Sequence, residues 1–227
     1  MTSVEVLDRE MYSEAEAARL LDLPQNTLNY WLEGKTVRGR HYKPVIRIEP
    51  KGGHPPVTWA EFVEAGLLAQ YRRDLKVGLP ELRTFIEELR QEFGVPYPLA
   101  SQRPYASGRA LVYNAQNRAS LPSDLHLVAA VADNQYLLLP ASDAFLRRVD
   151  FVDDVAASWR PHSEPSSPIR IDPRRRFGRP AIKGVSTQVI WEHIEVGESP
   201  GEVAEAFALT VRDVQWAISY ENARRAA

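Results

Sequence analysis

The start of the chain carries two short helical patterns separated by a break. Apolar residues recur on one helical face over residues 12–21, and Ser13 is placed to cap the start of that helix. Residues 22–24 end in proline and interrupt the pattern. A second helical pattern covers residues 25–33, and Gly34 marks its end. The sequence therefore predicts two short helices joined by a tight turn.

The hydrophobic period changes after the second helix. Residues 35–48 combine β-prone residues with Gly39, which favours a small hairpin over a helix. A third helix is predicted to begin near Thr58, a suitable N-cap, and a fourth is predicted over residues 79–93. This part of the chain is thus expected to be helical with one hairpin.

The middle of the chain has a different character, because prolines interrupt short β-prone runs. The runs cover residues 111–113, 127–131 and 136–139, and we expect a small, packed α/β connector. Serine and proline crowd residues 162–168, a composition typical of a linker. The strongest predicted boundary therefore lies near residue 165.

The last part of the chain predicts an extended segment followed by three helices. Ile169-Arg170-Ile171 is extended, and a loop with glycines and prolines follows it. One helix is predicted from Thr187, a second after the cap Ser199 and a third after the cap Thr210. An acidic residue stands three positions beyond each of these two caps, as in a capping box.

Together these elements predict a mainly α fold with a small β component. We expect three parts, covering residues 1–94, 95–164 and 165–227. With 44% hydrophobic and 26% charged residues, the composition is that of a soluble globular protein.

Nothing in the sequence directs the chain to a membrane or out of the cell. No apolar run approaches the roughly 18 residues that a membrane span requires, and residues 1–10 lack the basic start and apolar stretch of a secretory signal. The chain has no cysteine, which removes disulfides and thiolate metal sites and suits a reducing cytosol. We therefore expect a cytoplasmic protein that does not bind a membrane.

Charge is distributed unevenly along the chain. The formal net charge of −2 does not by itself indicate a nucleic-acid-binding protein, but the local field of a surface decides such binding. Two stretches are clearly basic. The first contains Lys35, Arg38, Arg40, His41, Lys43, Arg47 and Lys51, and the second contains Arg170, Arg174, Arg175, Arg176, Arg179 and Lys183.

The first basic stretch follows a predicted helix-turn-helix, in which the second helix enters the major groove of DNA. Its N-terminal side chains would be Gln25, Asn26 and Asn29, whose amides can bind adenine, with Thr27 near a phosphate or a thymine methyl group. The hairpin cations would then lie along the DNA backbone or minor groove. These cations are Lys35, Arg38, Arg40 and Lys43.

This region resembles the MerR-like winged helix, in which a Thr-Leu-Arg-Tyr-Trp-Glu sequence follows the turn. Residues 27–32 read Thr-Leu-Asn-Tyr-Trp-Leu. Asn29 replaces the usual arginine and Leu32 the usual acid, so the phosphate contact of that arginine would have to come from the hairpin. The alternative is that the two helices only pack a core, since a fold does not imply a function.

The second basic stretch belongs to a separate pattern of glycines and prolines. An Arg-Ile extended start is followed by Gly178-Arg179-Pro180-Ala181-Ile182-Lys183-Gly184 and then by the predicted helices. This resembles a small prokaryotic antitoxin domain once catalogued only as a family of unknown function, with a homeodomain-like three-helix bundle. One departure is Val185-Ser186, which stands where the family has Thr-Arg.

The resemblance implies a VapB-type antitoxin of a type II toxin–antitoxin system, which binds and blocks a PIN-domain ribonuclease of the VapC type and represses its own operon. Arginines can pair with the carboxylates of such a nuclease. They can equally bind operator phosphates or form a solvated loop. The candidate toxin-binding residues are Arg170, Arg174, Arg175, Arg176 and Arg179.

Operator DNA is usually read by paired modules, so we expect a homodimer. The apolar stripe of residues 79–93 could join two subunits, or it could only cover the core of its own subunit.

No feature of the sequence indicates an enzyme. The histidines are scattered without ligand spacing, and neither a phosphate-binding loop nor a nucleophile motif is present. Asp150, Asp153 and Asp154 form a carboxylate cluster that a turn or a charged helix face explains more simply than Mg²⁺ catalysis does. We therefore expect no cofactor and no metal.

Two rival functions remain at this point. In a ligand-responsive MerR-like regulator, the middle segment with Tyr105, Tyr113, Tyr136 and Trp159 would sense a small molecule. In a structural adaptor, both helix-turn-helix units would be vestigial. A neighbouring gene for a small acidic nuclease would favour the antitoxin over both.

Overall fold

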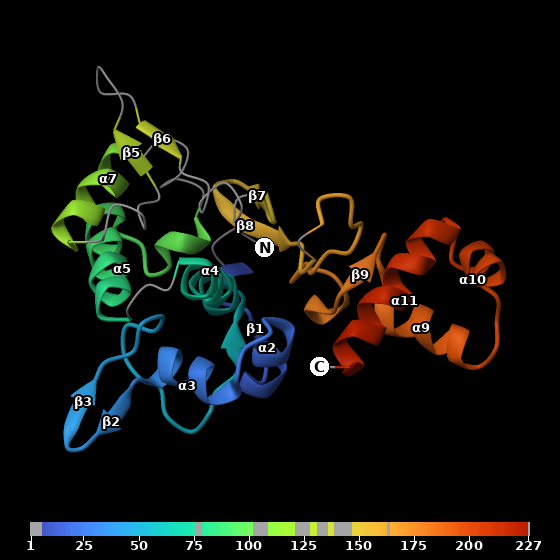
Figure 1. Ribbon diagram of the computed structural model, residues 1–227, viewed down its shortest axis with the longest axis horizontal. Helices are drawn as coiled ribbons and strands as arrows, with labels where there is room; N and C mark the ends of the chain where they lie inside the picture. Colours follow the sequence, from blue (N-terminus) through green and yellow to red (C-terminus); the bar gives the residue numbers. More distant parts are fainter. Residues whose placement is uncertain are drawn as a thin grey trace. The chain divides into compact units, whose positions relative to one another are not determined.

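The computed structural model describes residues 6–75, 79–101, 109–120, 128–130, 136–138, 147–162 and 164–226 (Figure 1). These residues form helices and small two-stranded sheets, which confirms the predicted mainly α fold with a small β component. The chain divides into two compact units, residues 1–156 and residues 157–227. The first unit thus contains the residues predicted as a helix-turn-helix and most of those predicted as a connector. The finer division at residues 94 and 164 stays a prediction.

The first unit begins with a short strand and the two predicted helices. Strand β1 (Glu10–Tyr12) pairs antiparallel with β4 (Val57–Thr58). Helix α2 (Glu14–Leu20) begins after Ser13, whose hydroxyl accepts from the Glu16 amide as predicted for a cap. Helix α3 (Gln25–Glu33) has the predicted bounds.

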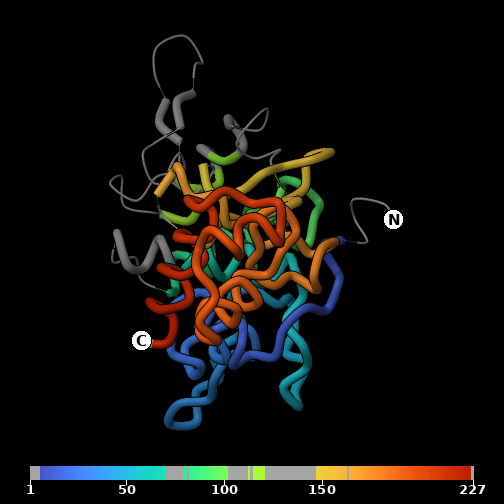
Figure 2. Tube along the Cα trace, turned by 90° about the vertical axis from the view of Figure 1, so that its right-hand side faces the viewer, coloured from blue at the N-terminus to red at the C-terminus, as the bar shows by residue number. Residues whose placement is uncertain are grey.

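A β-hairpin follows α3. Strands β2 (Lys35–Val37) and β3 (Arg40–Tyr42) pair antiparallel, so the hairpin predicted around Gly39 is confirmed. It extends away from the helices of the first unit (Figure 1, Figure 2). We call residues 35–43 the basic hairpin, because it carries all four of the predicted DNA-binding cations.

Two longer helices build the core of the first unit. Helix α4 (Trp59–Leu75) starts with the predicted cap, since the Thr58 hydroxyl accepts from the Glu61 amide and the Glu61 carboxylate accepts from the Thr58 amide. Trp59 and Phe62 are fully buried, and their ring centroids are 5.7 Å apart. Helix α5 (Leu79–Phe93) has the predicted bounds and is followed by a short 3₁₀ helix, η1 (Pro98–Ala100).

One of the predicted β-prone runs is wrong. Residues 111–113 lie inside helix α7 (Arg109–Arg118), which packs against α5. Among the side chains described in this segment, the buried ones are Val112, Ala115, Gln116 and Ala119, a helical spacing that outweighs the local β preference. The other two runs correspond to the paired strands β5 (Val128–Ala130) and β6 (Tyr136–Leu138).

A further strand pair was not predicted and lies where the carboxylate cluster falls. Strands β7 (Val149–Val152) and β8 (Val155–Trp159) are joined by Asp153-Asp154, and both aspartates have positive φ, 49° and 63°. Positive φ at both central residues is typical of a tight hairpin turn, in which aspartate is favoured. The turn interpretation is therefore correct for Asp153 and Asp154, whereas Asp150 lies in β7.

The second unit combines short extended segments with three helices. Trp159 and Ile171 exchange two backbone hydrogen bonds of 2.8 Å, and Arg170 pairs in the same way with Ala181. Strands β9 (Ala181–Ile182) and β10 (Val185–Ser186) follow a 3₁₀ turn, η3 (Arg176–Gly178). The residues predicted as a linker are held within this unit: Arg160 Nη1 donates to the Pro165 carbonyl, and Ser167 is buried.

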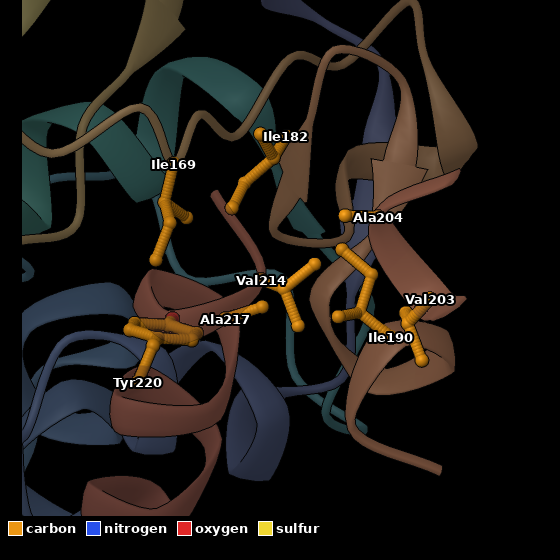
Figure 3. Close-up of a cluster of buried hydrophobic side chains, with 8 residues drawn as sticks. All are labelled: Ile169, Ile182, Ile190, Val203, Ala204, Val214, Ala217 and Tyr220. Atoms are coloured by element: carbon orange, nitrogen blue, oxygen red, sulfur yellow. The ribbon is translucent and has the colours of Figure 1, made fainter. Parts of the chain in front are cut away.

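The three predicted helices of the second unit are confirmed as α9 (Thr187–Glu195), α10 (Pro200–Ala206) and α11 (Val211–Ala226). Helix α10 has a full capping box between Ser199 and Glu202, and Thr210 and Asp213 exchange the same pair of bonds at α11. Their apolar faces meet in one core (Figure 3), which contains Ile169, Ile182, Ile190, Val203, Ala204, Val214, Ala217 and Tyr220.

Candidate functional site

Helix α3 presents polar side chains at its N-terminal end. Leu28, Trp31 and Leu32 are buried, which fixes the opposite face of α3 toward solvent. Of the four residues predicted to reach DNA from this helix, Gln25 and Asn26 are exposed, and Thr27 is half-buried. These three side chains are available at the N-terminal end of α3, where a recognition helix contacts bases.

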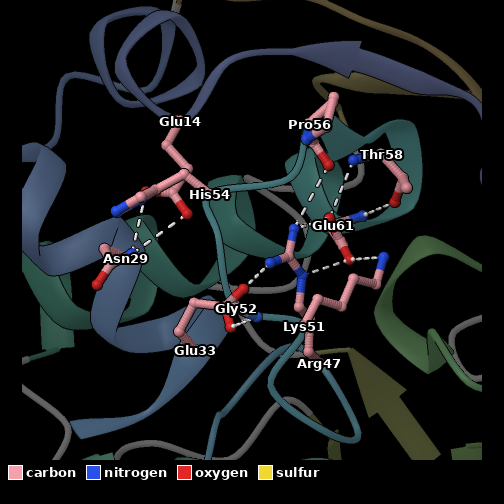
Figure 4. A network of polar contacts seen from close by, with 10 residues as sticks. All are labelled: Glu14, Asn29, Glu33, Arg47, Lys51, Gly52, His54, Pro56, Thr58 and Glu61. Atoms are coloured by element: carbon pink, nitrogen blue, oxygen red, sulfur yellow. Dashed lines mark hydrogen bonds and ion pairs between the residues drawn. The ribbon is translucent and has the colours of Figure 1, made fainter.

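Asn29, the fourth predicted DNA contact, has a partner inside the protein (Figure 4). Its side-chain amide donates to both carboxylate oxygens of Glu14, at 3.2 Å and 3.0 Å. His54 Nδ1 lies 3.0 Å from the same carboxylate. Because the Glu14 side chain is 2% exposed, this pair joins the start of α2 to the middle of α3. A DNA contact by Asn29 would have to share its amide with Glu14.

The basic hairpin has no buried residue. The four predicted contacts Lys35, Arg38, Arg40 and Lys43 are all exposed. The turn is formed by Arg38 and Gly39, both with positive φ, which matches the right-handed twist of a two-residue hairpin. An isolated two-stranded hairpin is marginally stable in water, so an exposed one with this charge fits a ligand-contacting element better than a packing element.

The two faces of the hairpin carry one contact between the strands and one contact along β3. Thr36 Oγ1 and His41 Nδ1 lie 3.2 Å apart on one face. On the other face, the guanidinium carbon of Arg40 lies 5.3 Å from the centre of the Tyr42 ring. The cations are thus displayed on an ordered scaffold.

The first basic stretch of the sequence is split by the fold. Arg47 is buried, and its Nε and Nη2 atoms donate to the two Glu61 oxygens at 2.8 Å and 3.0 Å (Figure 4). It also bonds to Glu33 at the end of α3. Lys51 Nζ lies 3.2 Å from Glu61. Arg47 is therefore a structural cation, Lys51 is exposed but paired with Glu61, and the four cations of the hairpin remain exposed.

Glu61 is the hub of this network. Burial alone would raise its pKa, but the hydrogen bonds from Arg47 and Thr58 and the charges of Arg47 and Lys51 outweigh burial and lower the pKa. The network joins the end of α3, the segment after the hairpin and the start of α4. It holds the base of the basic hairpin relative to the core.

Helix α5 also holds the base of the hairpin. Arg83 Nε donates to the carbonyls of Lys43 and Pro44 at 3.2 Å and 3.3 Å. About two turns further along α5, Arg90 Nη2 donates to the carbonyls of Val45 and Ile46. The segment that follows the hairpin is thereby anchored to α5.

A buried carboxyl group lies behind this region. Glu64 is fully buried and accepts from the Leu99 amide at 3.0 Å, while its Oε2 atom has no hydrogen-bond partner among the described residues. Burial raises its pKa to about 8, against the opposing charge of Arg90. Glu64 is therefore mostly protonated at neutral pH.

Four of the five candidate toxin-binding arginines lie on one loop of the second unit, and the fifth, Arg170, precedes it. We call residues 172–179 the arginine loop; in it Arg174, Arg175, Arg176 and Arg179 are exposed. Asp172 lies 3.7 Å from Arg174 and 3.6 Å from Arg175. Arg170 is half-buried and donates to the carbonyls of Ser167 and Ile169, so it is the member of the set most engaged with its own backbone.

The loop borders an open hollow within the second unit. Its charged lining comprises Arg170, Asp172, Arg175, Arg179 and Lys183, so positive charge predominates. Lys183 is paired with Asp213 at 3.0 Å, which moderates that charge. An anionic group is the chemistry that this hollow would accept.

Phe177, at the tip of the same loop, was missed as a candidate. Its side chain is 78% exposed although phenylalanine is usually buried. The only signal in the sequence was an aromatic residue between arginines and a glycine, which fits a core residue equally well.

No metal site or membrane span emerges from the described parts of the chain. Within these ranges, no group of three or more His, Asp or Glu side chains is arranged to hold a metal ion. No helix among them is long and apolar enough to cross a bilayer. Of the aromatic residues considered for ligand sensing, Tyr105 and the side chains of Tyr113 and Tyr136 lie outside the described part, and Trp159 is buried.

Comparison with known proteins gives matches to the last part and to the whole chain. Residues 169–220 match the family described as "Protein of unknown function (DUF433)", in line with the resemblance inferred from the glycines and prolines of this part. The crystal structure of Rv2018 from Mycobacterium tuberculosis superposes with a TM-score of 0.74 at 25% identity, covering 93% of this chain and 99% of that one. The two proteins share a fold.

Two curated proteins of Mycobacterium tuberculosis are similar over nearly their full lengths. "Putative antitoxin VapB45" is 27% identical over 217 residues, which cover 89% of this chain and 90% of that protein. "Uncharacterized protein Rv2308" is 34% identical over 234 residues, which cover 100% of this chain and 96% of that protein. The chain therefore belongs to the family of Rv2308, an antitoxin-like family, and its own second unit carries the DUF433 region.

Proposed function

We propose that the protein is the antitoxin of a type II toxin–antitoxin pair. It binds and neutralises a PIN-domain ribonuclease of the VapC type and represses its own operon by binding operator DNA. The observation that carries the proposal is the similarity to a protein named as an antitoxin over 89% of this chain. Two exposed cationic elements, one in each unit, support a division of labour between DNA and toxin.

The first unit is the proposed DNA reader, with the layout of a MerR-like winged helix. Gln25, Asn26 and Thr27 contact bases from the start of α3, and Asn29 contributes to the extent that Glu14 leaves its amide available. The basic hairpin acts as the wing and contacts phosphates. Its exposure and its anchoring by Arg83 and Arg90 support this role, since a wing must be both accessible and fixed in direction.

The second unit is the proposed toxin-binding part, with a homeodomain-like bundle beneath the arginine loop. Between Gly184 and Val211 the chain has no lysine or arginine and five acids, so α9 and α10 would repel phosphates. Positive charge in the loop suits the carboxylates that hold Mg²⁺ in a PIN-domain nuclease. The five acids are Glu192, Glu195, Glu198, Glu202 and Glu205.

We further propose that the protein acts in the cytoplasm as a homodimer without catalytic activity. Two copies would place two α3 helices on two half-sites of the operator. The antitoxin then needs no cofactor, because neutralisation requires only that the nuclease site be covered.

Paired double variants test the two roles against each other. Arg38→Ala with Arg40→Ala should weaken binding to a duplex from the protein's own promoter by at least tenfold, and should reduce the salt slope by about 2, at about 0.9 per lost phosphate contact. Arg174→Ala with Arg175→Ala should reduce co-purification with the PIN-domain ribonuclease encoded beside this gene. Each variant removes two arginines and serves as the charge-matched control for the other.

Each double variant should lose one of the two functions and keep the other. The hairpin variant should retain inhibition of the ribonuclease, and the loop variant should retain promoter binding. Failure of the unchanged protein to bind or inhibit the ribonuclease would remove the antitoxin role. An unchanged salt slope in the hairpin variant would remove the wing role alone.

A second candidate function is a ligand-responsive regulator. The observation that favours it is the set of hydrogen bonds from Arg83 and Arg90 to the segment after the hairpin, because a movement of α5 would be passed to the proposed wing. A small molecule that changes promoter affinity in the absence of any ribonuclease would support this function over the antitoxin.

A further inference from the structure

The arginine loop carries an apolar side chain that the protein itself does not use. Phe177 is 78% exposed, and among the described residues its ring has no aromatic or cation–π partner. An exposed single hydrophobic residue is common on surfaces. The backbone and the neighbours of Phe177 distinguish it from such a residue.

The backbone at this position is strained. Arg176, Phe177 and Gly178 have consecutive positive φ values of 49°, 53° and 67°. Glycine adopts this region freely, but a residue with a Cβ atom loses about 1–2 kcal/mol there. If the chain required only a turn, glycine, asparagine or aspartate would form it at lower cost. Arg176 has a partner within the protein, the Gly184 carbonyl, whereas the large side chain of Phe177 calls for a role outside the free protein.

Hydrogen bonds hold the strained loop in one conformation. The Arg174 amide donates to the Asp172 carboxylate at 2.8 Å, and the Arg175 amide donates to the Asp172 carbonyl at 3.0 Å. The Gly178 amide donates to the Arg175 carbonyl at 2.9 Å, and Arg176 Nε donates to the Gly184 carbonyl at 2.8 Å. A side chain displayed on a preorganised loop loses little entropy on binding, which is the condition for a strong anchor.

The charges around Phe177 indicate which kind of surface would receive it. Arg174, Arg175 and Arg179 are exposed on the same loop, and no hydrogen bond or ion pair of the Arg179 side chain is found among the described residues. An exposed aromatic side chain with arginines on both sides of it in the chain matches the composition of energetic hot spots in protein interfaces. A complementary partner has an apolar pocket with carboxylates at its edge.

We propose that Phe177 is the anchor by which this protein binds an acidic protein partner, inserting its ring into an apolar pocket while the loop arginines pair with carboxylates around it. The inference rests on the proposed antitoxin function, in which the partner is the ribonuclease. The main contact with the ribonuclease is then made by Phe177 and not by the arginines of the loop.

A protein partner fits these observations better than a nucleic acid. Aromatic and basic side chains also bind single strands, but such sites extend as a groove that follows many phosphates. Here four exposed arginines lie within six residues of one loop, and α9 and α10 carry carboxylates without a single lysine or arginine. A compact cationic loop with one exposed aromatic side chain suits a pocket, whereas a polyanion would meet repulsion from α9 and α10.

The test compares Phe177→Ala with Val196→Ala, since both side chains are 78% exposed in the second unit. The probe is the purified PIN-domain ribonuclease encoded beside this gene, and binding is measured by calorimetry with the full chain. Phe177→Ala should weaken the Kd by about 30-fold, as expected for a hot spot. Val196→Ala should leave the Kd unchanged, and Phe177→Leu should restore part of the affinity.

Thermal unfolding and nucleic-acid binding complete the test. Phe177→Ala should not lower Tm, because the side chain is mostly exposed, and should bind the promoter duplex and a dT15 strand like the unchanged protein. Equal ribonuclease affinity for Phe177→Ala and the unchanged protein would overturn the inference while leaving the antitoxin role intact. A loss confined to nucleic acid would also overturn it. Absence of ribonuclease binding by the unchanged protein would instead overturn the antitoxin role and the inference with it.

Discussion

Arg47 Nε lies 2.8 Å from Glu61 Oε1, and the two side chains are only 1% and 0% exposed. This buried pair joins the segment after the basic hairpin to the start of α4. Glu33 contacts the same guanidinium group, so one arginine compensates two carboxylates in the interior. Removing one partner of a buried ion pair lowers the free energy of unfolding far more than removing one partner of a surface pair does.

We expect Arg47→Ala to lower the free energy of unfolding of the first unit by about 3–5 kcal/mol, because it leaves buried carboxylates without a counter-charge. Urea denaturation measures the change. Lys51→Ala is the control: its side chain also contacts Glu61 but is 46% exposed, so the loss should stay below about 1 kcal/mol. Similar losses for both variants would contradict the assignment of Arg47 as the structural cation.

Asn29→Ala should destabilise the protein even without DNA. The substitution removes the amide that donates to the buried Glu14 carboxylate, at a cost of about 1–3 kcal/mol. Asn26→Ala is the matched control on the same helix, because Asn26 is exposed and should affect promoter recognition but not stability. If Asn29→Ala weakens DNA binding with no change in unfolding, the contact with Glu14 is not its main role.

Gly34→Ala should disrupt the basic hairpin at its base. Gly34 has φ 76° and ψ −169°, a region open almost only to glycine, and a Cβ atom there would lie 2.3 Å from the Tyr42 carbonyl oxygen. Promoter binding and stability should both fall. Gly39→Ala provides the comparison, since φ is 79° but no atom lies within 4 Å of the added Cβ, so only about 1–2 kcal/mol of backbone strain is expected. Equal effects of the two substitutions would rule out the clash.

Glu64 should make stability fall as pH rises. Its pKa is about 8 in the folded protein and 4.5 ordinarily, so the folded state holds the proton more tightly than the unfolded chain does. The protonated Glu64 makes its full contribution to the free energy of unfolding below pH 4.5 and loses it as pH rises through about 8. The free energy of unfolding falls by at most about 1.4 kcal/mol per pH unit. Glu64→Gln keeps an acceptor for the Leu99 amide and should flatten this slope. Glu87→Gln, on an exposed side chain, should not change it.

Elements with strong local signals were predictable from the sequence. The bounds of α3 and α5 follow from an apolar helical stripe and a terminal glycine, and the cap at Ser199 follows from the residue types alone. These signals act within a few residues of each other, so they survive without knowledge of the rest of the chain. Residues 111–113 were mispredicted because packing of α7 against α5 outweighs their β preference.

Partners of charged side chains were not predictable in the same way. Arg40 and Arg47 stand in one basic stretch, yet one is exposed on the hairpin and the other is buried against Glu61, 14 residues later in the chain. Phe177 has the composition of a core residue and is exposed because the loop backbone turns its side chain outward. Such contacts depend on which distant segments the fold brings together.

The sequence by itself determined the helices other than α7, the hairpin turn and the excess of positive charge in two segments, because caps, glycines, apolar periods and charges are local properties. Only the tertiary structure decided which of those charges remain available to a partner. The reason is physical: a buried cation must be paired with an acid, and the fold alone supplies Glu33 and Glu61 to Arg47 while it leaves the basic hairpin and the arginine loop in solvent.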